Sequence, residues 1–463
     1  MLPANDRFNR GACSAIRRRP WSAPRHRREA RVIALLKNTI HRPQSRRPND
    51  TRRRIRVLFI NDTSRNGGPG RSLFSILKFL DPERIHRAVL LPRPGIVSEL
   101  LEPVADEMFF LPTLVENPIE PVTRAMERAD FDAPAPLKAL RAVASVGKGA
   151  IAIARLTEIA RRGRFDLLYC NGTNADFAGG AVAWASGVPA LWHVRYTSLP
   201  PAVMGVHDRL AASAGVARIV CVSHAAAALF GHCPNKVRVI NNALDTREFA
   251  RGVVAPLLRA ELGLGADVVI FGSQGRILPR KGYAEMVRAA KLALDAMSEV
   301  EKQKVHFAVL GDTPEDIAPD HLAECRELAN TLGIANRFTF LGFRADVRPY
   351  VADFDVAVVP SVYADPLPRA VIETMAFGMP VLAFDVGGVA EMLADGETGA
   401  LVSASPPDVQ GLATQMLRYL RDPELRARQG LAARARIEAR FDARAHASAI
   451  QEEIVRTAGW GSE

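Results

Sequence analysis

From residue 55 onward, short apolar runs alternate with longer segments whose apolar residues recur every three or four positions. The short runs are almost continuously apolar, which indicates strands covered on both faces, as in a parallel sheet. They predict strands at 55–60, 87–91, 107–111, 166–170, 190–194, 218–222 and 237–240, and then at 268–271, 305–310, 338–341, 356–359 and 381–384. The longer segments predict helices, among them 135–162, 281–298, 318–331 and 368–377.

Strand and helix repeated in this order predict an α/β fold of the doubly wound type. Twelve strands are too many for one such sheet here, and the pattern is interrupted between Asn242 and Gly265, where Pro256 and three glycines surround a short helix. We therefore predict two Rossmann-like domains, 55–250 and 251–430, that face a central cleft. Helices at 431–463 are expected to pack back across it. Ligands should bind at the carboxyl ends of the strands.

The chain's net charge of +11 is concentrated in its first residues. Residues 1–54 contain fifteen Arg and one Lys against three acidic residues, a net charge of +13, which leaves −2 for residues 55–463. A nearly neutral body gives no support for a nucleic-acid partner. The basic segment has too few apolar residues to form a core, so its composition predicts a disordered tail.

The tail has several readings. It can be a solvated extension, a start codon placed too early, a transit peptide, or a segment that docks on anionic lipid. The scattered cysteines predict reduced thiols in a cytoplasmic protein. Neither a transmembrane run nor the apolar core of a signal peptide occurs. The predicted location is therefore the cytoplasm, with contact at the inner face of the cell membrane as an option.

A loop rich in glycine and cations follows the predicted strand at 268–271. It contains Gly275, Arg276, Lys281 and Gly282 and leads into a predicted helix. A guanidinium and an ammonium at a helix N-terminus bind a diphosphate by charge-assisted hydrogen bonds and by the helix dipole. The alternative is a surface loop with solvated charges, and the loop alone does not decide between them.

Two carboxylates eight residues apart form the second motif. Asp365 lies in a loop after the predicted strand at 356–359, and Glu373 lies one to two turns into the next helix. The segment Gly378-Met-Pro380 then ends that helix and begins a buried strand. An acid in such a position can accept both hydroxyls of a ribose, as in dinucleotide-binding folds.

Together these motifs resemble glycosyltransferase family 4, a large retaining family with the GT-B fold. The resemblance covers residues 55–440 and is more specific in the second half. It rests on Ser361 at a strand end, Asp365-x7-Glu373, Ala376-x-Gly378-x-Pro380-Val381, Gly275-Arg276 with Lys281-Gly282, the segment 236–245, the strand with Gly-Asp at 305–312, and Gly387-Gly388-x-x-Glu391.

The resemblance implies roles for these residues. Arg276 and Lys281 would hold the diphosphate of a nucleotide-sugar donor, and Glu373 would hold its ribose. Asp365 would contact the hydroxyls of the donor sugar, although the family usually has the longer Glu there. Gly387 and Gly388 would present backbone N–H groups to the sugar or phosphate.

In the first domain, the resemblance implies that the loop with Gly67 and Gly68 lies over the phosphates and the acceptor, whereas the alternative is a turn without a ligand. His193 follows a strand at a position where the family often has a histidine near the transferred sugar. A histidine there is otherwise structural. Arg195 is an added candidate for binding an anionic acceptor.

Three patterns resemble sites and are rejected. Asp353-Phe-Asp355 resembles the metal motif of another glycosyltransferase fold but precedes a buried strand instead of following one. Gly147-Lys148-Gly149 lacks the spacing of a Walker loop. His232-Cys233 has no further ligand at zinc spacing. Because Arg276 and Lys281 can stabilise a departing diphosphate, no metal cofactor is expected.

We therefore expect a retaining glycosyltransferase that moves a sugar from a UDP- or GDP-linked donor to a glycan or lipid-linked acceptor. Polysaccharide or lipopolysaccharide assembly is the pathway that the family resemblance implies. Two other functions stay open: a sugar-nucleotide epimerase of the same fold, and a non-catalytic protein that binds a nucleotide sugar.

Overall fold

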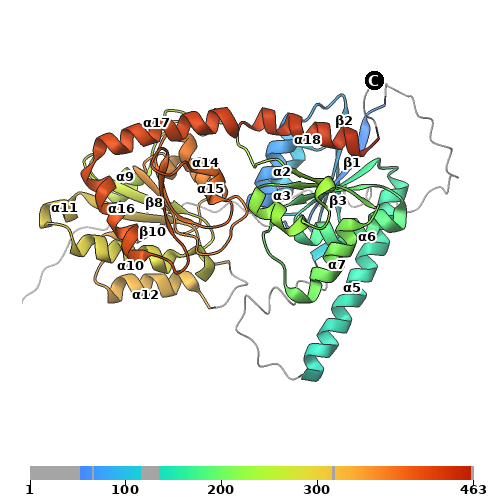
Figure 1. The fold of residues 1–463 in the computed structure, drawn as a ribbon, viewed down its shortest axis with the longest axis horizontal. Coiled ribbons are helices and arrows are strands. Elements are labelled where there is room, and N and C mark those ends of the chain that lie inside the picture. Colours follow the sequence, from blue (N-terminus) through green and yellow to red (C-terminus); the bar gives the residue numbers. More distant parts are fainter. Residues whose placement is uncertain (1–52, 65–66, 116–134, 315–318, 460–463) are drawn as a thin grey trace, which may run out of the picture. The chain divides into compact units, whose positions relative to one another are not determined.

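Two parallel sheets, each with helices on both faces, make up the described part of the chain (Figure 1). The computed structural model describes residues 53–64, 67–115, 135–314 and 319–459. Nearly all of the predicted basic tail lies outside these ranges, as does part of the loop before Gly67. The two sheets belong to one unit, residues 54–463. The predicted α/β fold with two doubly wound sheets is confirmed.

The first sheet has seven parallel strands in the order β3-β2-β1-β4-β5-β6-β7. Every one was predicted, with shifts of up to two residues at the ends. The strands are β1 (Ile55–Asn61), β2 (Ile85–Leu91), β3 (Glu107–Phe110), β4 (Leu167–Asn171), β5 (Ala190–Val194), β6 (Val216–Cys221) and β7 (Val237–Val239).

The second sheet has six parallel strands in the order β10-β9-β8-β11-β12-β13. Five were predicted, and β13 was not. The strands are β8 (Val269–Gln274), β9 (Val305–Leu310), β10 (Phe338–Phe340), β11 (Val356–Val359), β12 (Val381–Asp385) and β13 (Gly399–Ser403).

Helices cover both faces of the first sheet. Leu73, Val97 and Ile450 pack on one face, and Leu156, Val182 and Ala211 pack on the other. The first group of helices is α2 (Gly68–Phe79), α3 (Ile96–Leu101) and α18 (Ala443–Thr457); the second is α5 (Ala135–Arg162), α6 (Thr173–Ser186), α7 (Pro201–Ala212) and α8 (His224–Ala227). Short 3-10 turns lie at Glu102–Val104, Pro112–Val115, Ala228–Phe230 and Pro234–Lys236.

The second sheet is covered in the same way. Met286, Leu322 and Met416 pack on one face, and Val371 and Ile437 pack on the other. The first group of helices is α10 (Tyr283–Asp295), α12 (His321–Thr331) and α16 (Val409–Arg421), and the second is α9 (Leu258–Leu262), α13 (Arg348–Val351), α14 (Arg369–Ala376), α15 (Val389–Met392) and α17 (Pro423–Arg440). The helix α11 (Glu299–Gln303) and the 3-10 turn Pro279–Lys281 complete the elements.

Each sheet has one place where the strand order reverses. In the first sheet β1 lies between β2 and β4, and in the second β8 lies between β9 and β11. The loops that leave neighbouring strands at such a point run to opposite faces of the sheet, and the gap between them is where open α/β sheets bind ligands. Asn61 and Asn171 end the two strands at this point in the first sheet, and Gln274 ends β8 in the second.

The last two helices pack on different sheets. Ile437 of α17 belongs to a core of the second sheet, and Ile450 and Ile454 of α18 belong to a core of the first (Figure 1). A fully buried carboxylate of α18, Glu453, forms ion pairs with Arg218 of β6 and Arg238 of β7. The chain therefore crosses from one sheet to the other between α17 and α18. No helix in the described ranges is long and apolar enough to cross a membrane.

Acid should destabilise the fold through His446, a buried residue of α18. Burial and, secondarily, Arg195 and Arg369 lower the pKa of His446 to about 3. The unfolded chain binds a proton near pH 6.5 and the folded chain does not, so stability is lost as pH falls from 6.5 toward 3. Between pH 6.5 and 5 this residue should remove about 2 kcal/mol. Urea unfolding of wild type and His446→Leu at both pH values measures the difference.

The exposed His232 provides the control. His232→Gln should keep the pH dependence of the wild type, whereas His446→Leu should show a shallower loss of unfolding free energy on acidification. Equal slopes for wild type and His446→Leu would contradict the prediction.

Candidate functional site

The cation loop predicted after β8 lies at the carboxyl edge of the second sheet. Gly275 follows the last residue of the strand, Arg276 is exposed, and Lys281 ends a 3-10 turn directly before α10. A side chain at Gly282 is excluded because a Cβ there would lie 1.7 Å from the carbonyl oxygen of Pro360. The backbone at Gly282 also has a φ of 71°, which favours glycine. This contact holds the Lys281 loop against the loop after β11.

Lys281 and Asp365 form an ion pair across these two loops. The Nζ atom of Lys281 lies 2.5 Å from Oδ2 of Asp365, and both side chains are largely buried. The hydroxyl of Tyr363 donates a hydrogen bond to the same carboxylate oxygen at 3.1 Å. Burial and the nearby carboxylate raise the pKa of Tyr363. The structure thus brings together two of the predicted donor-site residues and adds Tyr363.

The glycine pair after β12 packs on the backbone of the Asp365 loop. A Cβ at Gly387 would lie 2.3 Å from the carbonyl oxygen of Asp365, and one at Gly388 would lie 1.9 Å from that of Pro366. The N–H of Gly388 donates to the Asp365 carbonyl at 2.8 Å. The expectation that this N–H faces a ligand is therefore wrong, because the close packing of the two loops already uses it. The two glycines hold Asp365 in place.

Glu373 lies in α14 with its carboxylate held on both sides. One oxygen accepts from Nε of Arg369 at 3.0 Å, and the other accepts from Nε2 of Gln274 at 2.9 Å. Gln274 is the last residue of β8, so Glu373 lies at the point where the strand order of the second sheet reverses. An acid held by two donors has a fixed orientation, and its remaining lone pairs can accept from hydroxyls.

Arg369 is a site residue that the sequence analysis missed. Besides Glu373, its guanidinium donates to the hydroxyl of Ser72 in α2 at 3.4 Å and to the carbonyl of Ala243 at 3.3 Å. A Cβ at Gly68 would lie 3.8 Å from its Cδ atom. The spacing of four residues between Arg369 and Glu373 on a helix was the available signal. Arg369 therefore joins the acid of the second sheet to the predicted glycine loop of the first.

The predicted glycine loop of the first sheet begins α2 at the matching reversal point. Gly67 precedes the helix, and the carbonyl of Pro69 accepts from Nδ2 of Asn171 at 3.2 Å. Asn171 also donates to Oδ1 of Asn61 at 2.6 Å. Two amides at the ends of β4 and β1 thus lie directly beside the loop.

His193 is fully buried in β5. Its Nδ1 atom contacts the hydroxyl of Tyr169, and its Nε2 atom has no partner among the described residues. Its ring lies 6.3 Å from that of His446 in α18. Burial, assisted by Arg195 and His446, holds the pKa of His193 well below its usual value, so the ring is neutral. Its surroundings are those of a core residue next to the site.

Arg195, two residues further on, is held by neutral groups. Its Nε atom donates to Oδ1 of Asn171 at 2.7 Å, Nη1 donates to Oδ1 of Asn242, and Nη2 lies 3.4 Å from Nδ1 of His193. Burial lowers the pKa of Arg195 to about 10, so it stays charged at neutral pH. The guanidinium lies between the amide of Asn171, which ends β4, and that of Asn242, which follows β7.

Several hydrogen bonds join the carboxyl edges of the two sheets. The hydroxyl of Thr197 donates to the carbonyl of Ala364, beside Asp365. The carboxylate of Glu391 accepts from the backbone N–H groups of His224 and Ala225 at 2.9 and 3.0 Å. Residues on the two edges are therefore in direct contact.

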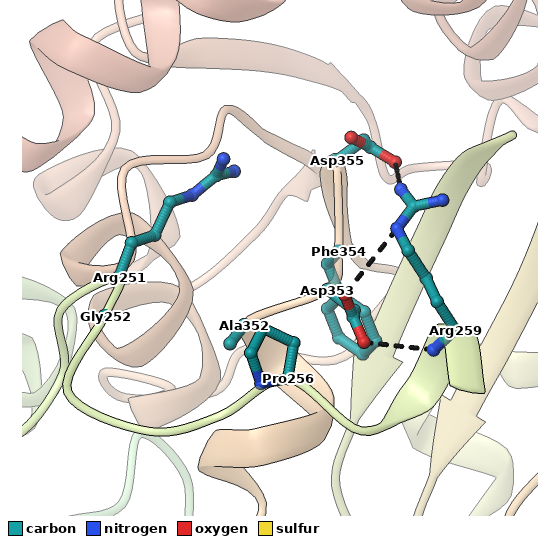
Figure 2. A pocket seen from close by; sticks show the side chains of 8 residues that line it. All are labelled: Arg251, Gly252, Pro256, Arg259, Ala352, Asp353, Phe354 and Asp355. Carbon is teal, nitrogen blue, oxygen red and sulfur yellow. Dashed lines mark hydrogen bonds and ion pairs between the residues drawn. The ribbon is translucent and has the colours of Figure 1, made fainter. Parts of the chain in front are cut away.

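The Asp-x-Asp pattern lies elsewhere, beside a cavity of about 250 Å³ (Figure 2). Asp353 accepts from the backbone N–H of Arg259 at 3.0 Å, and Asp355 accepts from its Nη2 at 2.6 Å and from the N–H of Ile270 at 2.8 Å. Both carboxylates precede β11 and so lie at the amino edge of the sheet. They hold Arg259, and the predicted position of this pattern, in a loop that enters the sheet, is confirmed.

Two family models match the chain. The model described as "Glycosyl transferases group 1" matches residues 255–436, and the model described as "Glycosyltransferase Family 4" matches residues 122–248. Together they span more than half of the sequence.

Curated relatives match over part of their length. The D-inositol 3-phosphate glycosyltransferase of Kribbella flavida is 33% identical over 46% of this chain and 49% of its own. The lipopolysaccharide core biosynthesis glycosyltransferase LpsE of Rhizobium meliloti is 32% identical over 42% of this chain and 50% of its own. The chain thus spans about half the length of the curated relatives it matches.

Solved structures match over most of the chain. Anabaena Alr3699/HepE, in complex with UDP and glucose, has a TM-score of 0.68 at 24% identity and covers 87% of this chain and 100% of its own. WaaG, a glycosyltransferase involved in lipopolysaccharide biosynthesis, has a TM-score of 0.62 at 15% identity. It covers 86% of this chain and 99% of its own. At these identities the likeness shows the fold.

The Lys281–Asp365 pair predicts that removing the carboxylate strengthens anion binding. In Asp365→Asn the ammonium of Lys281 no longer has a competing negative partner, so inorganic pyrophosphate should bind about 2- to 10-fold more tightly. In Lys281→Met it should bind about 10- to 100-fold more weakly, because a charge-assisted hydrogen bond is lost. Isothermal titration with pyrophosphate measures both changes.

Asp267→Asn is the matched control, since it removes the same charge at the amino edge of the same sheet. It should leave pyrophosphate affinity unchanged. An unchanged affinity in Asp365→Asn would mean that the ion pair does not compete with a bound anion.

Proposed function

The chain belongs to glycosyltransferase family 4, and from that membership we propose that it transfers a sugar from a nucleoside-diphosphate sugar to a hydroxyl of an acceptor. The acceptor we propose is a glycan or a glycolipid. The observation that supports this most directly is the group of Arg276, Lys281, Asp365 and Glu373 at the reversal point of the second sheet. The group combines two cations with two acids.

Each part of the donor finds a chemical partner in this group. The diphosphate lies at Arg276 and Lys281, the first exposed and the second directly before α10. The ribose hydroxyls donate to Glu373, which Arg369 and Gln274 hold in a fixed orientation. The transferred sugar lies toward Asp365. When the diphosphate approaches, Lys281 exchanges its carboxylate partner for a phosphate, and Asp365 becomes available to a sugar hydroxyl.

Catalysis then requires stabilisation of the departing diphosphate. Negative charge grows on the diphosphate as the bond to the sugar breaks, and fixed cations stabilise that charge without reorganisation. Arg276 and Lys281 supply two such cations, so we propose a metal-independent reaction. We also propose retention of the anomeric configuration, which the family resemblance supports, with the acceptor hydroxyl attacking on the face that the diphosphate leaves.

The acceptor lies at the edge of the first sheet in this proposal. The Gly67–Gly68 loop, Asn171 and Arg195 line that edge, and the hydrogen bond of Thr197 to Ala364 places it beside Asp365. One relative is named for D-inositol 3-phosphate and another for lipopolysaccharide core biosynthesis. Lipopolysaccharide or polysaccharide assembly in the cytoplasm, at the inner face of the membrane, is part of the proposal.

A screen of nucleotide sugars tests the donor site. The Anabaena protein was solved in complex with UDP and glucose, so UDP-glucose is the first ligand to test, followed by other UDP- and GDP-sugars. We expect at least one to raise the melting temperature of the wild type and to lose that effect in Lys281→Ala. No stabilisation of the wild type by any donor, or an unchanged shift in Lys281→Ala, would refute the donor site.

Product analysis with the stabilising donor and a mixture of glycan acceptors separates the remaining functions. Sugar found on an acceptor supports transfer, a donor with an inverted centre indicates an epimerase, and no turnover indicates a binding protein. We expect the basic tail to be dispensable for transfer to water-soluble substrates. If deletion of residues 1–54 abolished that activity, this expectation would be wrong.

Chelation should leave transfer unchanged. Because Arg276 and Lys281 carry the charge that a divalent ion would otherwise supply, dialysis against EDTA should not alter kcat. The rate is measured before and after dialysis and after addition of Mg²⁺ or Mn²⁺. A loss of activity that a divalent ion restores would show that a metal takes part.

A further inference from the structure

Arg195 forms no ion pair with an acidic side chain in the described part of the chain. The residues around it offer three polar contacts to its guanidinium, from Asn171, Asn242 and His193, and none is a carboxylate. His193 is neutral because burial depresses its pKa. A guanidinium removed from water without an anion is unfavourable, and such groups are concentrated at binding sites.

Two acids lie near Arg195 in the described part of the chain. Asp62 and Asp176 lie near enough to raise its pKa, but within the described ranges neither forms an ion pair with it. Asp176 is fully buried, and burial holds the pKa of its carboxyl well above its usual range, which favours the uncharged form. Arg369, also nearby, adds positive charge.

The amides hold Arg195 in one orientation. Asn61 fixes Asn171, and Asn171 and Asn242 each accept from one side of the guanidinium. A guanidinium has five N–H donors, and the contacts with described residues use at most three of them. The other two can serve an anion in the forked geometry that suits carboxylate and phosphate groups.

The position of Arg195 relates it to the acceptor and not to the donor's diphosphate. It follows β5 of the first sheet, whereas Arg276 and Lys281 follow β8 of the second. Asn171 joins it to the loop at Pro69, and Thr197, two residues away, bonds to the residue before Asp365. The guanidinium thus lies between the first-sheet loop and the proposed place of the transferred sugar.

We propose that Arg195 binds an anionic group, a phosphate or a carboxylate, of the acceptor. The inference rests on the proposed function and narrows it to acceptors that carry negative charge near the hydroxyl to be glycosylated. Asn171 and Asn242 are positioning residues, since they act by holding the guanidinium.

The experiment uses the full chain saturated with UDP and inorganic phosphate as the probe. In the proposed function, the diphosphate of UDP binds Arg276 and Lys281. Phosphate that binds to the UDP-saturated protein must then contact another cation, which we propose is Arg195. Calorimetric titration of phosphate should show binding to the UDP-saturated wild type. Arg195→Gln should weaken it about 10- to 100-fold. Arg195→Lys keeps the positive charge but not the bidentate geometry of the guanidinium, so its phosphate affinity should lie between those of the wild type and Arg195→Gln.

Two controls define what is measured. Arg209→Gln removes the same charge from the exposed surface of α7 in the same half and should leave phosphate affinity unchanged. The melting temperature and UDP affinity of Arg195→Gln are recorded. UDP affinity should stay within about twofold of the wild type, because the hydrogen bonds of Arg195 in the described part of the chain go to Asn171, Asn242 and His193 and not to the proposed donor residues.

The outcomes are distinct. Absence of UDP binding to the wild type would refute the proposed donor site. Binding of UDP without binding of phosphate, or equal phosphate binding in Arg195→Gln, would overturn the anion site and leave the proposed function standing. A loss of UDP affinity in Arg195→Gln would assign Arg195 to the donor. If UDP-glucuronate but not UDP-glucose bound more weakly to Arg195→Gln, the anion would belong to the donor sugar, which also overturns the proposal.

Discussion

The site depends on the close approach of backbone loops at the carboxyl edge of the second sheet. At Gly282 the chain passes the carbonyl of Pro360, and at Gly388 it passes that of Pro366, at distances that leave no room for a Cβ atom. These contacts bring together the loops after β8, β11 and β12. Only then can Lys281 reach Asp365, although 84 residues separate them in the sequence. Packing of backbone on backbone therefore sets the geometry in which the charged side chains act.

At the carboxyl edge of the first sheet, polar side chains are held by hydrogen bonds to one another. Asn61, Asn171 and Arg195 lie beside strands whose other side chains are almost entirely buried and apolar. Polar groups in such a place are unfavourable unless they are hydrogen-bonded, and here they bond mostly to one another. The resulting chain of amides is rigid and leaves a cation at its end. A fixed cation of this kind suits recognition of an anion better than a mobile surface lysine.

The sequence was sufficient for the fold and for part of the site. Continuous apolar runs predicted twelve of the thirteen strands, since burial on both faces leaves a strong signal. The strand Gly399–Ser403 was missed because it begins with glycine and is held by pairing with β12, which no local pattern records. Arg276, Lys281, Asp365 and Glu373 were named from their motifs, and their roles stay predictions. Gln274 and Arg369 were missed, and the free N–H at Gly388 was wrongly expected, because contacts between distant loops decide all three.

Arg369 links the proposed binding of the ribose at Glu373 to the arrangement of the two sheets. Its guanidinium holds Glu373, the proposed ribose acid, and at the same time donates to Ser72 and to the carbonyl of Ala243. The orientation of Glu373 is therefore set by contacts on both sheets. A change in the position of α2 relative to α14 would alter the hydrogen bonds of Arg369 and with them the carboxylate that receives the ribose. By reciprocity, a ribose that fixes Glu373 would favour the arrangement in which Arg369 also reaches Ser72.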